Sequence, residues 1–349
     1  MNVIIFIVAL SILVLVHEFG HYFAAKRTKV KVEEFGLGLP PRITGKKIGE
    51  TIFSLNWLPI GGFCKLYGED GGGEGNRAFN NKNPWQKMLI VLGGVLMNLF
   101  LAVVIFTIVY AILGVPSETD RVKVVGVAPE SPAAIAGLEE EDWIIKVGEE
   151  VIESPDELTN EVEKYKGESV ELLVESGGHE KTVTVEVREN PPEGEGGMGV
   201  AISNTEMVKV PWYQFYKGIV AGFEEAYFWG KIIVGGVASM VGGLLSGNVP
   251  KDVSGPIGMF EATSTIKESQ GMLAVVHFFG VVSVNLAVVN VLPFPALDGG
   301  RIIFVLYELI SGRKANQRVE SIINSIGMVI LLGLIVLITA GDIARLINN

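Results

Sequence analysis

The chain has 349 residues, 49% of them hydrophobic, and a formal net charge of −11. This composition is too apolar for an ordinary soluble domain of this length and indicates a multi-spanning membrane protein, and the single cysteine, Cys64, excludes a disulfide framework or a metal site of several cysteines. Residues 116–211 hold 23 acidic and 8 basic residues, so an acidic module is set into a mildly basic body, and no nucleic-acid partner is indicated.

Four stretches are long and apolar enough to cross a bilayer, which takes about 20 residues. They are predicted at 3–25, 88–113, 275–297 and 322–340. Basic residues follow the first stretch and none precedes it, which disfavours a cleaved signal peptide. Because 11 Lys and Arg lie between the first two stretches, that connection is expected in the cytoplasm. The termini and the acidic segment are then expected outside.

The first predicted span contains His17-Glu18-Phe19-Gly20-His21. On a helix, residues i and i+4 share a face, so both imidazoles can face one metal ion. Glu18 can then act as general base on a water at that metal. A charge at the bilayer centre costs about 2.5 to 3.5 kcal/mol, so an intramembrane Glu18 indicates a function, although a role in helix packing stays open.

The segment between the first two spans, 30–67, is predicted as β structure on the cytoplasmic side. The part from Thr51 to Phe63 alternates in polarity and ends in Pro and Gly, which favours a hairpin over a span. An ordinary cytoplasmic loop with a short hairpin is the alternative. In the second span, Gly93 and Gly94 permit close helix packing.

The acidic segment 116–192 is predicted to be a small folded domain. Strands are expected at 122–127, 170–174 and 182–187, and one short helix at 156–165. The run from Ser131 to Leu138, followed by Asp142-Trp-Ile-Ile, resembles the core of a bacterial PDZ domain, although Glu141 stands where Gly is usual. Such a domain would bind an extended peptide at a sheet edge, and another kind of β-rich domain is the alternative.

Residues 193–274 are predicted to be an extracytoplasmic linker with interfacial helices. Their apolar stretch, 219–245, contains Glu224, Glu225 and Lys231 together with many glycines, so it fits a span poorly.

A third metal ligand is needed, because a catalytic zinc usually takes three protein ligands and leaves one position for water. Asp298 is the candidate, since Pro293 and Pro295 must break the helix just before it. If 219–245 lies on the surface, the third span runs in the same direction as the first. Asp298 then reaches the depth of His21.

Three features together resemble the site-2 protease family of RseP-like intramembrane zinc metalloproteases. They are the His-Glu-x-x-His in the first span, the PDZ-like insertion, and Asn290-x-x-Pro-x-Pro-x-Leu-Asp298-Gly. The resemblance covers essentially the whole chain. It implies one Zn²⁺ bound by His17, His21 and Asp298, with Glu18 as the catalytic acid and base.

The resemblance also implies roles at the substrate. Asn290 is expected to hold the substrate backbone or the developing oxyanion, and the hairpin edge to pair with unwound substrate through Phe53, Ser54, Leu55 and Asn56. Support for the site is expected from Asn98, Pro293 and Pro295. The implied substrates are transmembrane proteins such as anti-sigma factors or signal-peptide remnants, cut after prior trimming in regulated intramembrane proteolysis. The implied location is the bacterial cytoplasmic membrane, in contact with lipid.

The predicted fold is therefore a polytopic α-helical membrane protein with four transmembrane helices, a membrane-associated β-hairpin and an inserted α+β PDZ-like extracytoplasmic domain. Its parts are predicted at 1–115, 116–192, 193–274 and 275–349. A non-catalytic membrane scaffold that binds partners through the PDZ-like domain is one alternative. A membrane-anchored zincin with its site in the cytoplasm is another, and it would need a third ligand outside the bilayer.

Overall fold

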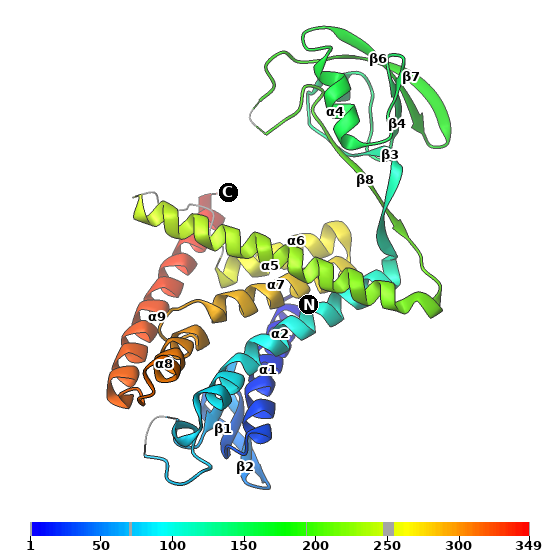
Figure 1. Ribbon diagram of the computed structural model, residues 1–349. Helices are drawn as coiled ribbons and strands as arrows, with labels where there is room; N and C mark the ends of the chain where they lie inside the picture. The colour runs from blue at the N-terminus through cyan, green and yellow to red at the C-terminus, as the bar shows by residue number, and fades with distance from the viewer. Residues whose placement is uncertain (1, 70–71, 193, 247–254, 349) are drawn as a thin grey trace. The chain divides into compact units, whose positions relative to one another are not determined.

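The computed structural model describes residues 2–69, 72–192, 194–246 and 255–348 (Figure 1). The chain divides into two compact units. Met1–Tyr110 and Tyr213–Asn349 form one, here called the helical unit, and Ala111–Trp212 form the other, here called the inserted domain.

Four helices of the helical unit are long and apolar enough to cross a membrane, which confirms the predicted number on the basis of length and composition. Lys29, with a φ of 60°, takes the left-handed conformation that commonly follows the end of a helix, here the first. The four helices are α1 (Asn2–Arg27), α2 (Pro84–Leu113), α7 (Met272–Val291) and α9 (Gln317–Asn348).

The third predicted span is shorter than expected. Helix α7 ends at Val291, and Asp298 begins a separate helix, α8 (Asp298–Ser311). Pro293 lacks the N–H that a continuing helix needs and restricts the residue before it, so the helix cannot run on to residue 297. The break predicted from the prolines is therefore complete, and Asp298 belongs to the following helix.

The stretch predicted to lie at the membrane interface is one helix, α5 (Phe215–Leu245), and it is not among the four candidate spans. Glu225 Oε2 accepts a hydrogen bond from the Tyr110 hydroxyl of α2 at 2.8 Å, and its Oε1 lies 3.0 Å from Nε2 of His277 on α7. The helix also exposes large apolar and aromatic side chains, including Phe223 and Tyr227. A further helix, α6 (Pro256–Gln270), contacts α7 and α9.

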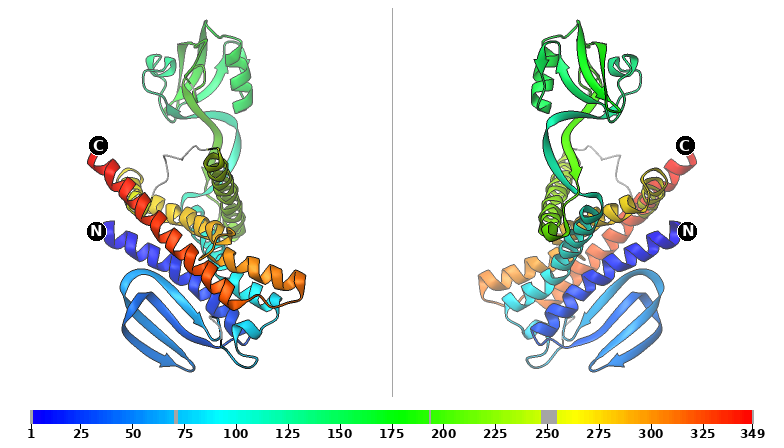
Figure 2. Two further views of the ribbon diagram at one scale, coloured as in Figure 1. Left: turned by 90° about the vertical axis from the view of Figure 1, so that its left-hand side faces the viewer. Right: turned by 90° about the vertical axis from the view of Figure 1, so that its right-hand side faces the viewer.

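Two long strands, β1 (Val32–Ile48) and β2 (Thr51–Leu66), lie along α1 (Figures 1 and 2). Each strand contributes two paired segments. Segment 32–37 pairs with both 52–55 and 62–66, and 42–48 pairs with 51–56. The spatial order is therefore 42–48, 51–56, 32–37, 62–66, which leaves 62–66 at one edge. A short 3-10 turn, Phe79–Asn81, precedes α2.

The inserted domain is a mixed domain built on one antiparallel sheet in the order β7-β6-β4-β3-β8, with β5 paired to β4. Ser131 and Ser154 cap its two short helices, each with Pro at the helix start. The strands are β3 (Val115–Val127), β4 (Trp143–Val147), β5 (Glu150–Val151), β6 (Ser169–Ser176), β7 (His179–Glu186) and β8 (Val200–Val208), and the helices are α3 (Pro132–Ile135) and α4 (Pro155–Glu163).

The predicted domain boundary at residue 192 is too early. Strand β8 pairs with β3 from Val127–Val200 to Val115–Val208, so the domain continues to Trp212. The Pro- and Gly-rich stretch 190–199 resembles a linker in sequence, but its described residues, 190–192 and 194–199, are irregular segments inside the domain. A 3-10 turn, Trp212–Gln214, follows the last strand.

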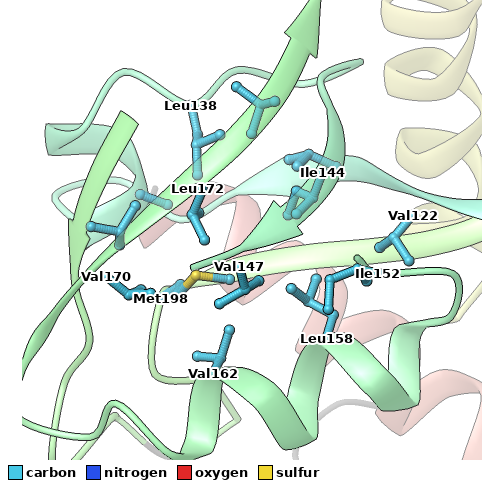
Figure 3. Close-up of a cluster of buried hydrophobic side chains, with 14 of the residues drawn as sticks. Val122, Leu138, Ile144, Val147, Ile152, Leu158, Val162, Val170, Leu172 and Met198 are labelled. Carbon is cyan, nitrogen blue, oxygen red and sulfur yellow. The ribbon is translucent and has the colours of Figure 1, made fainter. Parts of the chain in front are cut away.

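Alternating apolar residues of the sheet and the inner face of α4 form the core of the inserted domain (Figure 3). Leu158 and Val162, four residues apart on α4, are both buried and point toward the sheet. Their partners include Val122, Ile144, Val147, Leu172 and Met198. This core is independent of the helical unit, in which all the predicted metal ligands lie.

Candidate metal centre

Three potential metal ligands from distant parts of the chain converge in the helical unit. His17 and His21 are one turn apart on α1, because a helix brings residues i and i+4 to one face. Nε2 of His17 is 3.1 Å from Oδ2 of Asp298, and Nε2 of His21 is 3.3 Å from the same atom. The two Nε2 atoms are 3.2 Å apart. Three atoms that can each offer a lone pair therefore surround one point.

The break between α7 and α8 brings Asp298 to this point. Ala296, with a φ of 74°, turns the chain back in the left-handed conformation. At Gly299 an added Cβ would lie 1.9 Å from a carbonyl oxygen of the preceding loop, so only glycine fits there. Pro293 and Pro295 shape the loop but do not line the cavity at the site. The Asp-Gly-Gly sequence thus provides both the ligand and the tight turn.

The cluster fits a zinc ion in both geometry and chemistry. Ligand atoms about 2.0 to 2.1 Å from a tetrahedral zinc are roughly 3.3 Å apart, close to the spacing here. Oδ2 of Asp298 is buried, and no described hydrogen-bond donor is aligned on it. A buried carboxylate oxygen in this state needs a positive partner. Two imidazoles and one carboxylate are a ligand set that zinc accepts, with a fourth position left for water.

Helix α2 forms the wall behind both imidazoles. An added Cβ at Gly20 of α1 would lie 2.1 Å from the carbonyl oxygen of Gly93, so the two helices touch through their backbones. An added Cβ at Gly94 would lie 2.5 Å from Nε2 of His21 and 2.6 Å from Cε1 of His17. These contacts agree with the close packing predicted for the glycines.

The same helix also supplies polar partners for both rings. Nδ1 of His21 lies 2.9 Å from the carbonyl oxygen of Ile90, one turn before Gly94. The side-chain amide of Asn98, one turn after Gly94, lies 3.3 Å from Nδ1 of His17. Asn98 is completely buried. The structure therefore brings this predicted supporting residue into contact with a candidate ligand.

A cavity of about 490 Å³ opens at the cluster, and both Glu18 and Asn290 line it. Among the described residues, none forms a hydrogen bond or ion pair with the Glu18 carboxylate, which leaves its oxygens available to water or substrate. An added Cβ at Gly62 would lie 3.3 Å from Cγ of Glu18, so the edge segment of β2 passes beside the carboxylate. The structure thus gathers the predicted ligands, the predicted acid/base and Asn290 around one space.

The predicted substrate-binding residues lie elsewhere, in the inner segment of β2: Phe53, Ser54, Leu55 and Asn56. This segment has paired neighbours on both sides, 32–37 and 42–48, so it offers no edge for strand addition. None of the four residues lines the cavity, whereas Phe63 and Cys64 of the edge segment do. Sequence alternation marks both segments as strands, but the order of strands is a tertiary property.

Sequence reasoning missed an ion pair at the rim of the cavity. Arg301, one turn after Asp298, pairs with Glu69, and both line the cavity. Burial alone would lower the pKa of Arg301, but the nearby Glu69 carboxylate raises it above its ordinary value. Oε2 of Glu69 also accepts a hydrogen bond from the backbone N–H of Leu66 at 3.0 Å. In the sequence, this pair could have been suspected from Arg301, a charged residue that directly follows Asp298-Gly-Gly in an apolar stretch.

Comparison with known proteins gives matches along almost the whole chain. The model of Peptidase family M50 matches residues 5–334. A protein of Clostridium perfringens named as a putative zinc metalloprotease is 35% identical over 350 residues, with 98% of each chain covered. One of the same name from Clostridium acetobutylicum is 33% identical, covering 99% of this chain and 98% of its own. Zinc metalloprotease RasP of Geobacillus kaustophilus is 27% identical, with the same coverage.

Among solved structures, a PDZ domain of an SdrC-like protein from Listeria monocytogenes matches 24% of this chain and 87% of its own length. The sequence identity is 23% and the TM-score is 0.22.

Proposed function

Because the chain belongs to peptidase family M50, the site-2 proteases, we propose that His17, His21 and Asp298 hold one zinc ion and that Glu18 is the catalytic acid and base. The chain is a zinc metalloprotease of the kind that carries out intramembrane proteolysis. The observation that supports the proposed residues is the convergence of three ligand atoms from α1 and α8 beside Glu18, whose carboxylate has no hydrogen-bond or ion-pair partner among the described residues.

In the proposed reaction, water adds to the carbonyl carbon of a peptide bond and the C–N bond then breaks. A zinc ion bound at the cluster supplies a Lewis acid that polarises the carbonyl and makes water more acidic. Glu18 accepts the proton that the attacking water loses, and it returns that proton to the departing nitrogen. Asn290, at the end of α7 on the cavity wall, is proposed to donate its side-chain N–H to the substrate carbonyl.

A transmembrane substrate must unwind before it is cut, because a helix hides its carbonyls in its own hydrogen bonds. We assign the strand that receives it to the edge segment 62–66, in place of 53–56. Among the residues that the structure describes, segment 62–66 pairs with 32–37 alone, and its residues Phe63 and Cys64 line the cavity. An unwound substrate would add to this edge as a further strand and pass beside Glu18.

The proposed location is the bacterial cytoplasmic membrane, with lipid around the helices. The basic connection between α1 and α2 supports a cytoplasmic position for β1 and β2. We propose in consequence that the termini and the inserted domain lie outside. The proposed substrates are transmembrane segments of membrane proteins, such as anti-sigma factors or signal-peptide remnants, that another protease has already trimmed.

The inserted domain is proposed to be PDZ-like and to select substrates. A cavity of about 210 Å³ lies between α4 and β8, with Leu158, Val162 and Met198 among its lining residues. Strand β8 is at the edge of its sheet, so an extended peptide or a peptide C-terminus could pair with it beside this apolar pocket. Exclusion of substrates with bulky outer domains is the other role that this domain could have.

The decisive experiment incubates the purified, zinc-loaded protein with a model transmembrane substrate. Wild type should cut within the membrane segment, whereas Glu18→Gln should retain zinc and lose cleavage. Asp298→Ala should lose both zinc and cleavage. A Glu18→Gln variant that is fully active would refute the proposed catalytic role. Zinc retained in Asp298→Ala would instead favour an anchored enzyme with its metal site outside the bilayer, and a wild type without zinc would favour the scaffold alternative.

A further inference from the structure

Asn98 lies against a candidate zinc ligand, and zinc binding by that ligand would allow only one set of hydrogen positions between the two side chains. Its side chain is completely buried. One atom of its amide group is 3.3 Å from Nδ1 of His17, and the other is buried without a hydrogen-bond partner among the described residues. One end of this buried amide lacks a partner in either orientation, so the contact with His17 decides which orientation is favoured.

The proposed zinc site determines which nitrogen of the His17 ring carries hydrogen. Its Nε2 faces Oδ2 of Asp298 and Nε2 of His21, so Nε2 is the atom whose lone pair a metal would use. A neutral imidazole that offers the lone pair of Nε2 carries its hydrogen on Nδ1. Nδ1 of His17 is therefore a donor, and the group opposite it must be an acceptor.

The amide of Asn98 meets this requirement when its oxygen faces the ring. Amide oxygen and nitrogen occupy equivalent positions, so their assignment follows from the hydrogen-bond partners. With the –NH₂ group toward Nδ1 of His17, two donors would face each other. A half turn of the amide places Oδ1 there to accept the Nδ1–H, without moving any other atom of the wall.

His21 provides an independent parallel. Its Nδ1 lies 2.9 Å from the carbonyl oxygen of Ile90, a group that can only accept. Its hydrogen is therefore also on Nδ1, and its Nε2 is also free. Helix α2 thus fixes one ring through a backbone carbonyl and the other through Asn98, eight residues later on the same helix.

The position of Asn98 is itself fixed from behind. Its backbone carbonyl oxygen accepts a hydrogen bond from the hydroxyl of Ser283 on α7 at 2.8 Å, and Ser283 is also completely buried. The side chain that faces His17 therefore stands on a rigid contact between two helices. A rigid partner beyond the ligand is what holds a metal-binding imidazole in the right tautomer and direction.

We propose that Asn98 is a positioning residue for His17, with Oδ1 accepting the Nδ1–H so that Nε2 is free for zinc. This inference rests on the proposed zinc site, and it adds a specific role for a residue that is not a ligand. Loss of such a partner typically lowers metal affinity about 10- to 100-fold.

The test compares Asn98→Leu, which removes the acceptor at nearly constant size, with Asn98→Asp, which keeps an acceptor. Thr263→Val is the matched control, because it removes a buried hydroxyl from α6, in the same unit but away from the cavity, and leaves the Asn98 amide and its contacts in place. Zinc affinity is measured by competition with a chelator on the full-length protein in detergent. The visible spectrum of the cobalt-substituted protein reports ligand geometry independently of activity.

Asn98→Leu should bind zinc about 10- to 100-fold more weakly and show an altered cobalt spectrum. Asn98→Asp should restore the affinity, and Thr263→Val should leave both readouts as in wild type. Wild-type affinity in Asn98→Leu, or an equal loss in Asn98→Asp, would overturn the inference while leaving the zinc site intact. A wild type that binds no zinc would instead overturn the proposed function on which the inference rests.

Discussion

Glycines are as important to the candidate metal site as the ligands are. Gly94 lies under both imidazoles, and Gly20 and Gly93 let α1 touch α2 through backbone atoms. A ligand helix held this closely cannot turn or withdraw without losing its packing. The position of both rings is therefore set before any metal binds.

We predict that Gly94→Ala lowers zinc affinity at least about 10-fold, because the new methyl group would lie 2.5 Å from Nε2 of His21 and must push the ring away. The matched control is Gly333→Ala, a glycine of α9 at which an added Cβ meets nothing within 4 Å. Zinc per chain after equilibration with a chelator measures the effect. Equal zinc retention in the two variants would contradict this prediction.

A second residue-scale prediction concerns Asp142 in the inserted domain, which is 2% exposed. Burial would raise its pKa, but hydrogen bonds from Ser176, the backbone N–H of Glu139 and Lys181 lower the pKa below its usual range. The folded-state pKa thus lies below that of the unfolded chain, about 3.9. The resulting stability is fully present above about pH 5 and is lost as the pH falls through the folded-state pKa.

Asp142→Asn should therefore destabilise β3 and β4 by about 1.5 to 3 kcal/mol at neutral pH. Hydrogen exchange of residues 122–147 in the full-length protein, compared with wild type at equal pH, measures the difference. That difference should shrink as the pH is lowered. The exposed Glu163→Gln serves as control and should change exchange little. A difference that is constant with pH would show that the carboxylate charge is not its source.

The candidate site could be predicted from sequence as far as local geometry and chain direction reach. The spacing of His17 and His21 alone predicts that they share a helix face. The predicted directions of the spans put Asp298 at the same depth in the bilayer as these two residues. The contact between Asn98 and His17 could not be predicted in the same way. It depends on how α1 crosses α2, which the spacing along either helix does not encode.

At the scale of elements, the least predictable feature is the order of the four strand segments in β1 and β2. Alternating residues and turn signals predict that strands exist, but each segment could occupy an edge. Segment 32–37 pairs on both sides, which puts 62–66 beside the cavity and 51–56 inside the sheet. The break after α7 was easier to predict than its exact end, since a proline such as Pro293 interrupts a helix interior, although the predicted span ran on to residue 297.

The strand order makes a direct prediction, because Cys64 is the only cysteine of the chain and lines the cavity from the edge segment. With an added thiol oxidant, which accepts the two electrons released when the S–S bond forms, a substrate with one cysteine near its cleavage site should form a disulfide with Cys64 in the Glu18→Gln background. Burial raises the pKa of the Cys64 thiol, so the reaction should be slow and should speed up at alkaline pH.

The control carries Cys64→Ser together with Ser54→Cys, which moves the thiol to the inner segment, where Ser54 is 7% exposed. Its disulfide with the same substrate should not exceed the background seen without oxidant. Non-reducing gel electrophoresis of both proteins gives the comparison. Stronger cross-linking at residue 54 than at residue 64 would return the substrate to the segment first expected from sequence.

At the scale of the whole molecule, catalytic and selective functions are assigned to separate compact units. The proposed ligands, Glu18 and Asn290 all belong to the helical unit. The inserted domain has its own core, and the chain enters and leaves it side by side, since Val115 pairs with Val208. Paired strands are about 4.8 Å apart, so a short linker could replace the domain without straining the helical unit.

We predict that replacing residues 116–207 with a short Gly/Ser linker preserves cleavage of a trimmed transmembrane substrate and newly permits cleavage of the untrimmed one. The chemistry is complete within the helical unit, so only selection should be lost. The measurement is the ratio of the cleavage rates of the untrimmed and trimmed substrates. A Glu18→Gln version of the same deletion gives the background rate. If the deletion keeps the wild-type ratio, the inserted domain does not select substrates. If the deletion still binds zinc but cleaves neither substrate, the helical unit alone does not hold the complete active site.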